Sequence, residues 1–150
     1  MTLSEQTATL FGIGRAPAAP GTVASLAALP LAWAIKWFTN DWIFLAIIVA
    51  VTIIAIRVCE AYARETGVTD PSECVIDELA GQWIACLLAP LSLIGFGLAL
   101  VLFRAFDIAK PWPIERFERA PGGLGIVLDD VVAGLLAGII VGVVRLIGLI

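Results

Sequence analysis

Four stretches of this 150-residue chain contain no charged side chain, and they constrain its fold more than any other feature of the sequence. They are residues 16–35, 42–56, 79–103 and 131–144. A helix that crosses a bilayer needs about 20 mostly apolar residues, with about 17 as the lower limit. Because lipid offers the backbone no hydrogen-bond partner, such segments are expected to be helical. The sequence therefore predicts an all-α polytopic membrane bundle, formed as a single domain over residues 1–150.

The amino-acid composition agrees with this class and excludes several others. Hydrophobic residues make up 61% of the chain and charged residues 15%, which excludes an ordinary soluble domain and a disordered segment. The net charge of −4 gives no electrostatic reason to bind nucleic acid. Since the chain has no histidine, it cannot use an imidazole of its own as base, nucleophile or metal ligand. Cys59, Cys74 and Cys86 show no CxxC spacing, which predicts free buried thiols.

The helix boundaries follow from the ends of the apolar runs. The first helix is expected over residues 22–38, with Thr22 as its N-cap and a kink at Pro30. The second is expected from Asp41 to about Arg64, because the apolar run continues into a polar stretch. The last helix is expected near residues 129–148.

The long run of residues 79–103 could form one helix or a hairpin hinged at residues 89–92, and the basic residues favour the hairpin. Lysine and arginine collect on the cytoplasmic side of a membrane protein. With helices at 75–90 and 92–109, seven basic residues fall on one face and only Lys36 and Arg145 on the other. The seven are Arg15, Arg57, Arg64, Arg104, Lys110, Arg116 and Arg119. We therefore expect about five short helices, with the N-terminus in the cytoplasm and the C-terminus outside.

Acidic residues are expected to gather at the same cytoplasmic face. The candidates are Asp77, Glu78, Asp107, Asp129 and Asp130. Asp77 and Glu78 could serve only to complement the dipole at a helix start, but a carboxylate at the edge of an apolar run is usually functional. Asp129 and Asp130 repel each other unless a cation lies between them. A cluster of carboxylates without histidine or cysteine favours a hard ion such as Mg²⁺.

Basic residues beside these acids suggest a phosphate ester as substrate. Arg104, Asp107 and Lys110 are spaced three apart and share one helical stripe, which could also be a solvated face with internal ion pairs. Arginine binds phosphate oxygens through a bidentate fork, whereas lysine acts as a point charge. The glycine-rich residues 122–125 would let the backbone approach a ligand.

Several phosphatase mechanisms are excluded by missing residues. A phosphohistidine intermediate needs a histidine, and a CxxxxxR motif is absent because Glu65 lies six positions after Cys59. A DxDx(T/V) motif is also absent, since Asp129 and Asp130 are adjacent. Metal-activated water and a single aspartate nucleophile both remain open.

Four stretches of the sequence resemble the phosphatidylglycerophosphatase A family. They are GRAPAAPGTVASLAAL from Gly14 to Leu29, VIDELAGQW from Val75 to Trp83, RAFDIAKPWPI from Arg104 to Ile114, and GGLGIVLDDVVA from Gly122 to Ala133. The four occur in the family's order and span nearly the whole chain. The resemblance implies an all-helical, Mg²⁺-dependent phosphatase of the bacterial inner membrane, with its active site facing the cytoplasm. It would hydrolyse phosphatidylglycerophosphate to phosphatidylglycerol and inorganic phosphate during phospholipid synthesis.

The resemblance and the chemistry of these residues together suggest a role for each. The metal ligands would be Asp77, Glu78, Asp107, Asp129 and Asp130, among which Asp107 and Asp130 would also be catalytic. Arg104 and Lys110 would hold the phosphate and take part in catalysis. Thr22 and Gly123 would add hydroxyl and backbone donors to the substrate site.

Two functions of other classes compete with this interpretation. A divalent-cation channel or transporter would need acidic residues within the spans or on both sides, whereas the outer face offers only Asp41. A non-catalytic membrane scaffold would bind a partner through its polar loops. The spacing of Gly134, Gly138 and Gly142 predicts close helix packing, either within one subunit or in a homo-oligomer.

Overall fold

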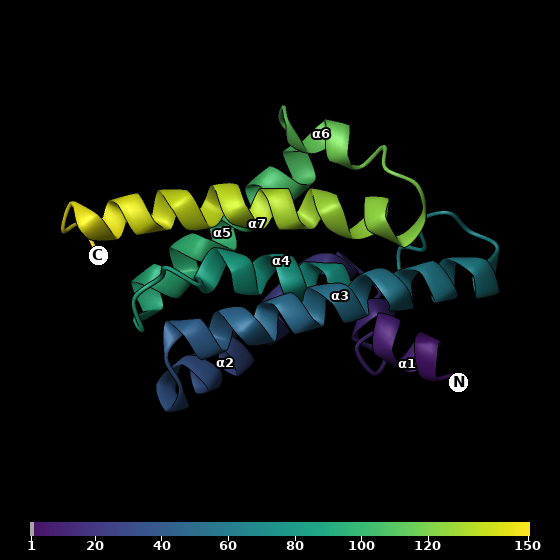
Figure 1. The fold of residues 1–150 in the computed structure, drawn as a ribbon, viewed down its shortest axis with the longest axis horizontal. Helices are drawn as coiled ribbons and strands as arrows, with labels where there is room; N and C mark the ends of the chain where they lie inside the picture. The colour runs from purple at the N-terminus through teal and green to yellow at the C-terminus, as the bar shows by residue number, and fades with distance from the viewer. Residues whose placement is uncertain (1) are drawn as a thin grey trace.

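Residues 2–150 of the computed structural model form seven α-helices and a short 3₁₀-helix, with no strand in that range (Figure 1). The α-helices are α1 (Leu3–Ala8), α2 (Pro20–Phe38), α3 (Asp41–Thr66), α4 (Ile76–Cys86), α5 (Leu93–Ala109), α6 (Ile114–Phe117) and α7 (Gly122–Leu146), and the 3₁₀-helix is η1 (Ile13–Arg15). By length and composition, α2, α3 and α7 can each cross a membrane. The prediction of an all-α membrane bundle is confirmed.

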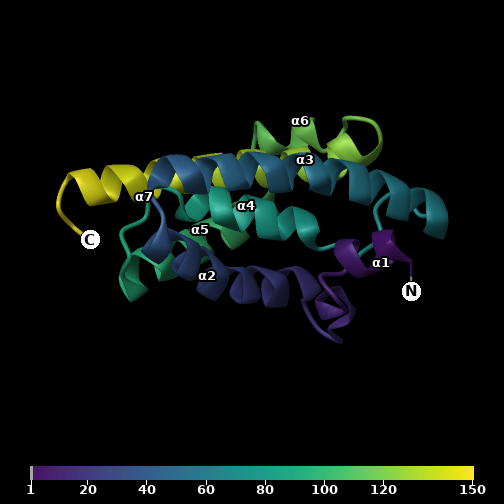
Figure 2. The same cartoon turned by 60° about the horizontal axis from the view of Figure 1, so that its bottom comes forward.

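The long helices alternate in direction, so the polar connections meet at one end of the bundle (Figures 1 and 2). This polar end comprises residues 2–19, 67–75 and 110–121, and the opposite, far end comprises residues 39–40, 87–92 and 147–150. The hairpin prediction is confirmed, because six residues separate α4 from α5. The first hairpin helix is shorter than expected, since α4 ends at Cys86.

Two predicted helix starts are wrong. Helix α2 begins at Pro20, so Thr22 lies inside the first turn and is not the N-cap. Proline suits this first position because its fixed φ matches a helix and its missing N–H would have no intrahelical partner. Helix α7 begins at Gly122 and not near residue 129, so the glycine-rich stretch is its first turn and not a loop. The glycines there allow close packing, since a Cβ atom at Gly123 would overlap the Ile56 carbonyl of α3.

The eleven-residue helix α4 forms the centre of the bundle. Ten of its residues are buried, and it packs against α2, α3, α5 and α7. At 1.5 Å per residue it spans only about 16 Å, less than the thickness of the hydrocarbon core. Its Trp83 Nε1 donates a hydrogen bond to the Ala28 carbonyl of α2 over 2.9 Å.

The glycine row of α7 packs against α4 of the same chain. A Cβ atom at Gly134 would overlap the Gly81 carbonyl, and one at Gly138 would lie 3.0 Å from the Ile84 carbonyl. The close packing that the glycine spacing predicted is therefore found within one subunit.

The C-terminal end of α4 is held by a buried lysine at the far end. Lys36 of α2 has a side chain only 5% exposed, and its Nζ donates to the carbonyls of Cys86, Leu87 and Ala89 over 3.2, 2.6 and 2.9 Å. Asp41 lies 3.3 Å from the same Nζ. The last carbonyls of a helix have no intrahelical donor and carry partial negative charge, so a lysine there satisfies both requirements.

We expect Lys36→Met to lower the free energy of unfolding by roughly 3 kcal/mol, because it leaves three carbonyls without their charged donor. Thermal unfolding in detergent measures the change. Arg145→Met is the control, since Arg145 makes one longer bond, 3.2 Å to the Leu88 carbonyl, at an exposed site. Equal stability of the two variants would contradict the role given to Lys36.

Candidate active site

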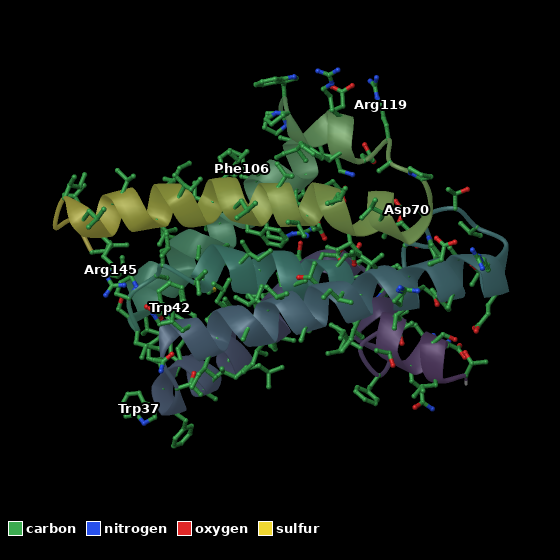
Figure 3. The ribbon with its side chains drawn as sticks, viewed as in Figure 1. Trp37, Trp42, Asp70, Phe106, Arg119 and Arg145 are labelled. Atoms are coloured by element: carbon green, nitrogen blue, oxygen red, sulfur yellow. The ribbon has the colours of Figure 1, made fainter. Side chains whose placement is uncertain are left out.

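A cavity of about 200 Å³ opens at the polar end, where α2, α4, α5 and α7 meet the connection between α3 and α4. Figure 3 labels Asp70 at this end, whereas Trp37, Trp42 and Arg145 lie toward the far end. The cavity is lined by Pro20, Gly21, Asp70, Pro71, Ser72, Cys74, Asp77, Glu78, Asp107, Lys110, Ile126, Asp129 and Asp130. All five predicted acidic residues, and Lys110, therefore line one space.

The carboxylates form two groups that share Asp130. One oxygen each from Asp77, Glu78 and Asp130 lie within 4.8 Å of one another, and so do oxygens from Asp107, Asp129 and Asp130. Asp77 and Glu78 come from the first turn of α4, Asp107 from the last turn of α5, and the aspartate pair from the second and third turns of α7. Three helices thus bring together acids that are far apart in the sequence.

Two carboxylate oxygens of this cluster are buried without a hydrogen bond. They are Asp77 Oδ1 and Glu78 Oε2, which find no donor among the residues that the structure describes. A buried polar atom without a partner is costly, and the neighbouring negative charges increase that cost. Oxygens in this arrangement are the ligands that a hard divalent cation prefers. The residues present therefore fit a Mg²⁺ ion.

The two predicted cations are both ion-paired with this cluster. Arg104 Nη1 lies 2.5 Å from Asp107 Oδ2, so the alternative of internal ion pairs along the stripe holds for these two residues. Lys110 Nζ lies 2.8 Å from Asp129 Oδ2 and 2.7 Å from Glu118 Oε1. Although partial burial opposes its charged form, the hydrogen bonds and negative charges of Asp129 and Glu118 raise the pKa of Lys110 above its ordinary value. The charged form of Lys110 is therefore favoured in the cavity wall.

Gly21 allows α2 to approach the cluster. A Cβ atom at this position would overlap Glu78 Oε1 and would lie 3.1 Å from both Arg104 Nη atoms. Arg104 itself is not part of the cavity wall and lies beside it. Thr22, the next residue along α2, is half-buried and also lies outside the wall.

Gly123 is not brought to the cavity. Its amide donates a hydrogen bond of 2.6 Å to Glu60 Oε2, which ties the first turn of α7 to α3. The structure instead adds Asp70, Ser72 and Cys74 to the cavity wall, which sequence reasoning missed. The available signal was the Asp-Pro-Ser turn a few residues before Asp77.

The three cysteines are free and buried, as their spacing predicted. The sulfur atoms of Cys59 and Cys74 lie 2.9 Å apart and link α3 to the segment that leads into α4.

Comparison with known proteins identifies the family of the chain. The profile of a family described as phosphatidylglycerophosphatase A matches residues 6–145. The chain belongs to this family. It is 38% identical over 137 residues to phosphatidylglycerophosphatase A of Escherichia coli strain K12, covering 87% of this chain and 77% of that protein. No solved structure gives a significant match.

Two further relatives show that the similarity extends across bacteria. Phosphatidylglycerophosphatase A of Haemophilus influenzae is 37% identical over 133 residues, or 87% of this chain and 82% of that protein. A candidate phosphatidylinositol-3-phosphatase of Bacteroides thetaiotaomicron is 35% identical over 143 residues, or 90% and 89%. The protein is thus a phosphatase enzyme with membrane-spanning helices.

We expect Gly21→Ala to lower phosphatase activity at least tenfold, because the added methyl group displaces the Glu78 carboxylate. Phosphate release by the purified protein measures the change. Val23→Ala is the matched control, since Val23 lies on the exposed side of the same helix and lines neither the cavity nor the apolar groove between α2 and α5. Comparable activity of the two variants would contradict the steric role of Gly21.

Proposed function

We propose that the protein hydrolyses phosphatidylglycerophosphate to phosphatidylglycerol and inorganic phosphate with the help of Mg²⁺. Family membership supports the substrate. The observation that supports the metal is that two buried oxygens of cavity residues, Asp77 Oδ1 and Glu78 Oε2, have no hydrogen-bond partner within residues 2–150.

All five carboxylates could act as metal ligands, in two groups. Asp130 belongs to both groups: the first adds Asp77 and Glu78, and the second adds Asp107 and Asp129. Bound there, Mg²⁺ would supply the positive charge that neutralises the phosphate and activates water. Asp107 and Asp130 would also be catalytic, because Asp107 lines the cavity next to Arg104 and Asp130 belongs to both carboxylate groups.

The basic residues of the site position the phosphate and the acids. Lys110 lies in the cavity wall, where its ammonium group can exchange its hydrogen bond to Asp129 for one to a phosphate oxygen when the substrate enters. Arg104 lies beside the cavity wall and holds Asp107 through Nη1. Its buried Nε lacks an acceptor within residues 2–150, which makes it a candidate donor to the phosphate. Thr22, which follows Gly21 in α2, would add a hydroxyl donor, whereas the Gly123 amide already donates to Glu60. Positioning and electrostatic stabilisation carry most of the catalysis in such reactions.

We also propose that the protein lies in the bacterial inner membrane with this site facing the cytoplasm. The polar end holds the segments that carry Arg15, Lys110, Arg116 and Arg119. An excess of basic residues is typical of the cytoplasmic side. The phosphate group would then be released where phospholipids are made.

Headgroup preference is a separate question that the relatives raise. The Bacteroides relative carries the name of a phosphatase for a phosphoinositide. A second cavity of about 230 Å³ adjoins the site and shares Asp70, Ile126 and Asp129 with it, which leaves room for a polar headgroup. Assays with phosphatidylglycerophosphate and phosphatidylinositol 3-phosphate side by side decide between the two substrates, and faster hydrolysis of the second would overturn our choice.

We expect Asp107→Asn to abolish phosphate release while the protein stays folded, because the amide removes a charge that the cluster needs and keeps the side-chain shape. The assay uses phosphatidylglycerophosphate in detergent with Mg²⁺, and gel filtration checks the fold. Glu115→Gln is the control, since Glu115 pairs with Arg119 on an exposed helix outside the cavity. Near-normal activity of Asp107→Asn would sink the proposed mechanism.

We expect EDTA to stop the reaction and Mg²⁺ to restore it. The all-oxygen donor set predicts better restoration by Mg²⁺ than by thiophilic ions such as Zn²⁺. Phosphate release measured across added metals tests this. Full activity after exhaustive chelation would rule out the metal, and metal transport without phosphate release would favour a channel.

A further inference from the structure

An apolar groove of about 440 Å³ lies between α2 and α5. Its walls come from Leu29, Pro30, Trp33 and Ala34 of α2 and from Leu93, Phe96 and Gly97 of α5. Phe96 is buried and meets the Trp33 ring edge-on, with 5.0 Å between ring centres. Gly97 leaves open space, because a Cβ atom there would have no heavy atom within 4 Å.

The groove and the carboxylate cluster lie along the same pair of helices. At the polar end, α2 and α5 approach each other where Gly21 meets Arg104. Pro30 is nine residues from Gly21, and Gly97 is seven residues from Arg104. At 1.5 Å per residue these separations are roughly 14 and 10 Å. Half of a hydrocarbon core of about 30 Å is about 15 Å, so the near end of the groove lies within the depth of one bilayer leaflet from the site.

We propose that this groove binds one acyl chain of the phospholipid substrate while its phosphate lies at the carboxylate cluster. The inference rests on the proposed function. A lipid phosphate needs a polar site and an apolar site one leaflet apart, and the helices α2 and α5 provide both. The charged part of the site stays at the polar end, with Arg104 and Lys110, whereas no charged residue lines the groove.

A second apolar recess is the competing site for an acyl chain. It lies between α3, α4 and α7, is about 270 Å³ in volume, and includes Val49, Thr52 and Leu135. No residue of α2 or α5 lines it. This recess is also near the site, because its Val131 follows Asp130 in α7. The α2–α5 groove is favoured because it is larger, about 440 Å³, and lies between the two helices that carry Gly21 and Arg104.

The test is to fill the groove with Gly97→Leu. The leucine enters open space and favours a helix more than glycine does, so the fold is retained. Phosphate release is measured with long-chain and with six-carbon-chain phosphatidylglycerophosphate in detergent. We expect KM for the long-chain lipid to rise at least fivefold while its kcat stays nearly unchanged. For the short-chain lipid, KM and kcat should both stay nearly unchanged. Val49→Trp, which fills the second recess, is the control and should leave KM for both lipids nearly unchanged.

Several results would overturn the inference. They are an unchanged KM for the long-chain lipid in Gly97→Leu, an equal rise for both lipids, or an equal rise in Val49→Trp. If Gly97→Leu does not fold, Ala34→Leu fills the same groove from α2.

A binding measurement separates failure of this inference from failure of the proposed function. Tryptophan fluorescence is quenched with phosphatidylglycerophosphate that carries brominated acyl chains, in the parent protein and in Trp33→Phe. We expect the phosphate lipid to quench more than brominated phosphatidylcholine does, and Trp33→Phe to lose that excess. Equal quenching by the two lipids means that the groove holds bulk membrane lipid, whereas selective quenching without phosphate release overturns only the proposed reaction.

Discussion

The burial of α4 is the constraint on which the rest of the structure depends. A helix of eleven residues cannot span a bilayer, and its two ends would expose unpaired backbone groups to lipid. Four longer helices surround it and exclude lipid. Its N-terminal end carries Asp77 and Glu78, and its C-terminal end receives Lys36, so each end of the helix dipole meets the opposite charge. The same arrangement that makes the short helix tolerable places two carboxylates at the edge of the membrane.

Close backbone contact lets this central helix pack so tightly. Gly134 and Gly138 bring α7 against α4, and Gly21 brings α2 against the Glu78 carboxylate. Small residues at such interfaces allow van der Waals packing, which replaces the hydrophobic driving force that is missing in lipid. The glycines therefore act on the active site indirectly, because they set how near the acid-bearing helices come to one another.

Much of the fold and of the candidate site could be predicted from the sequence. Charge-free runs and the placement of basic residues predicted the helical class and the α4–α5 hairpin, because both are governed by the cost of charge in lipid. The five acids that line the cavity were predicted for the same reason. The start of α7 was not, since a glycine-rich stretch favours a loop locally and only packing against α3 makes it helical. Gly123 was therefore expected at the site, whereas its amide is bound to Glu60. Ser72 was missed because the Asp-Pro-Ser turn indicates a loop but not the tertiary contacts that bring it to the cavity.

The connection between α4 and α5 has a consequence for how the chain enters the membrane. Residues 79–103 include this turn and contain no charge, so the hairpin can insert from the polar end without moving a charged group across the bilayer. The donors that hold the turn lie on either side of the hairpin in the chain, with Lys36 earlier and Arg145 later. During synthesis, Lys36 is already made when the hairpin emerges, whereas Arg145 is made at the end of α7. The turn can therefore gain its lysine donor when the hairpin inserts and its arginine donor only after α7 has been made.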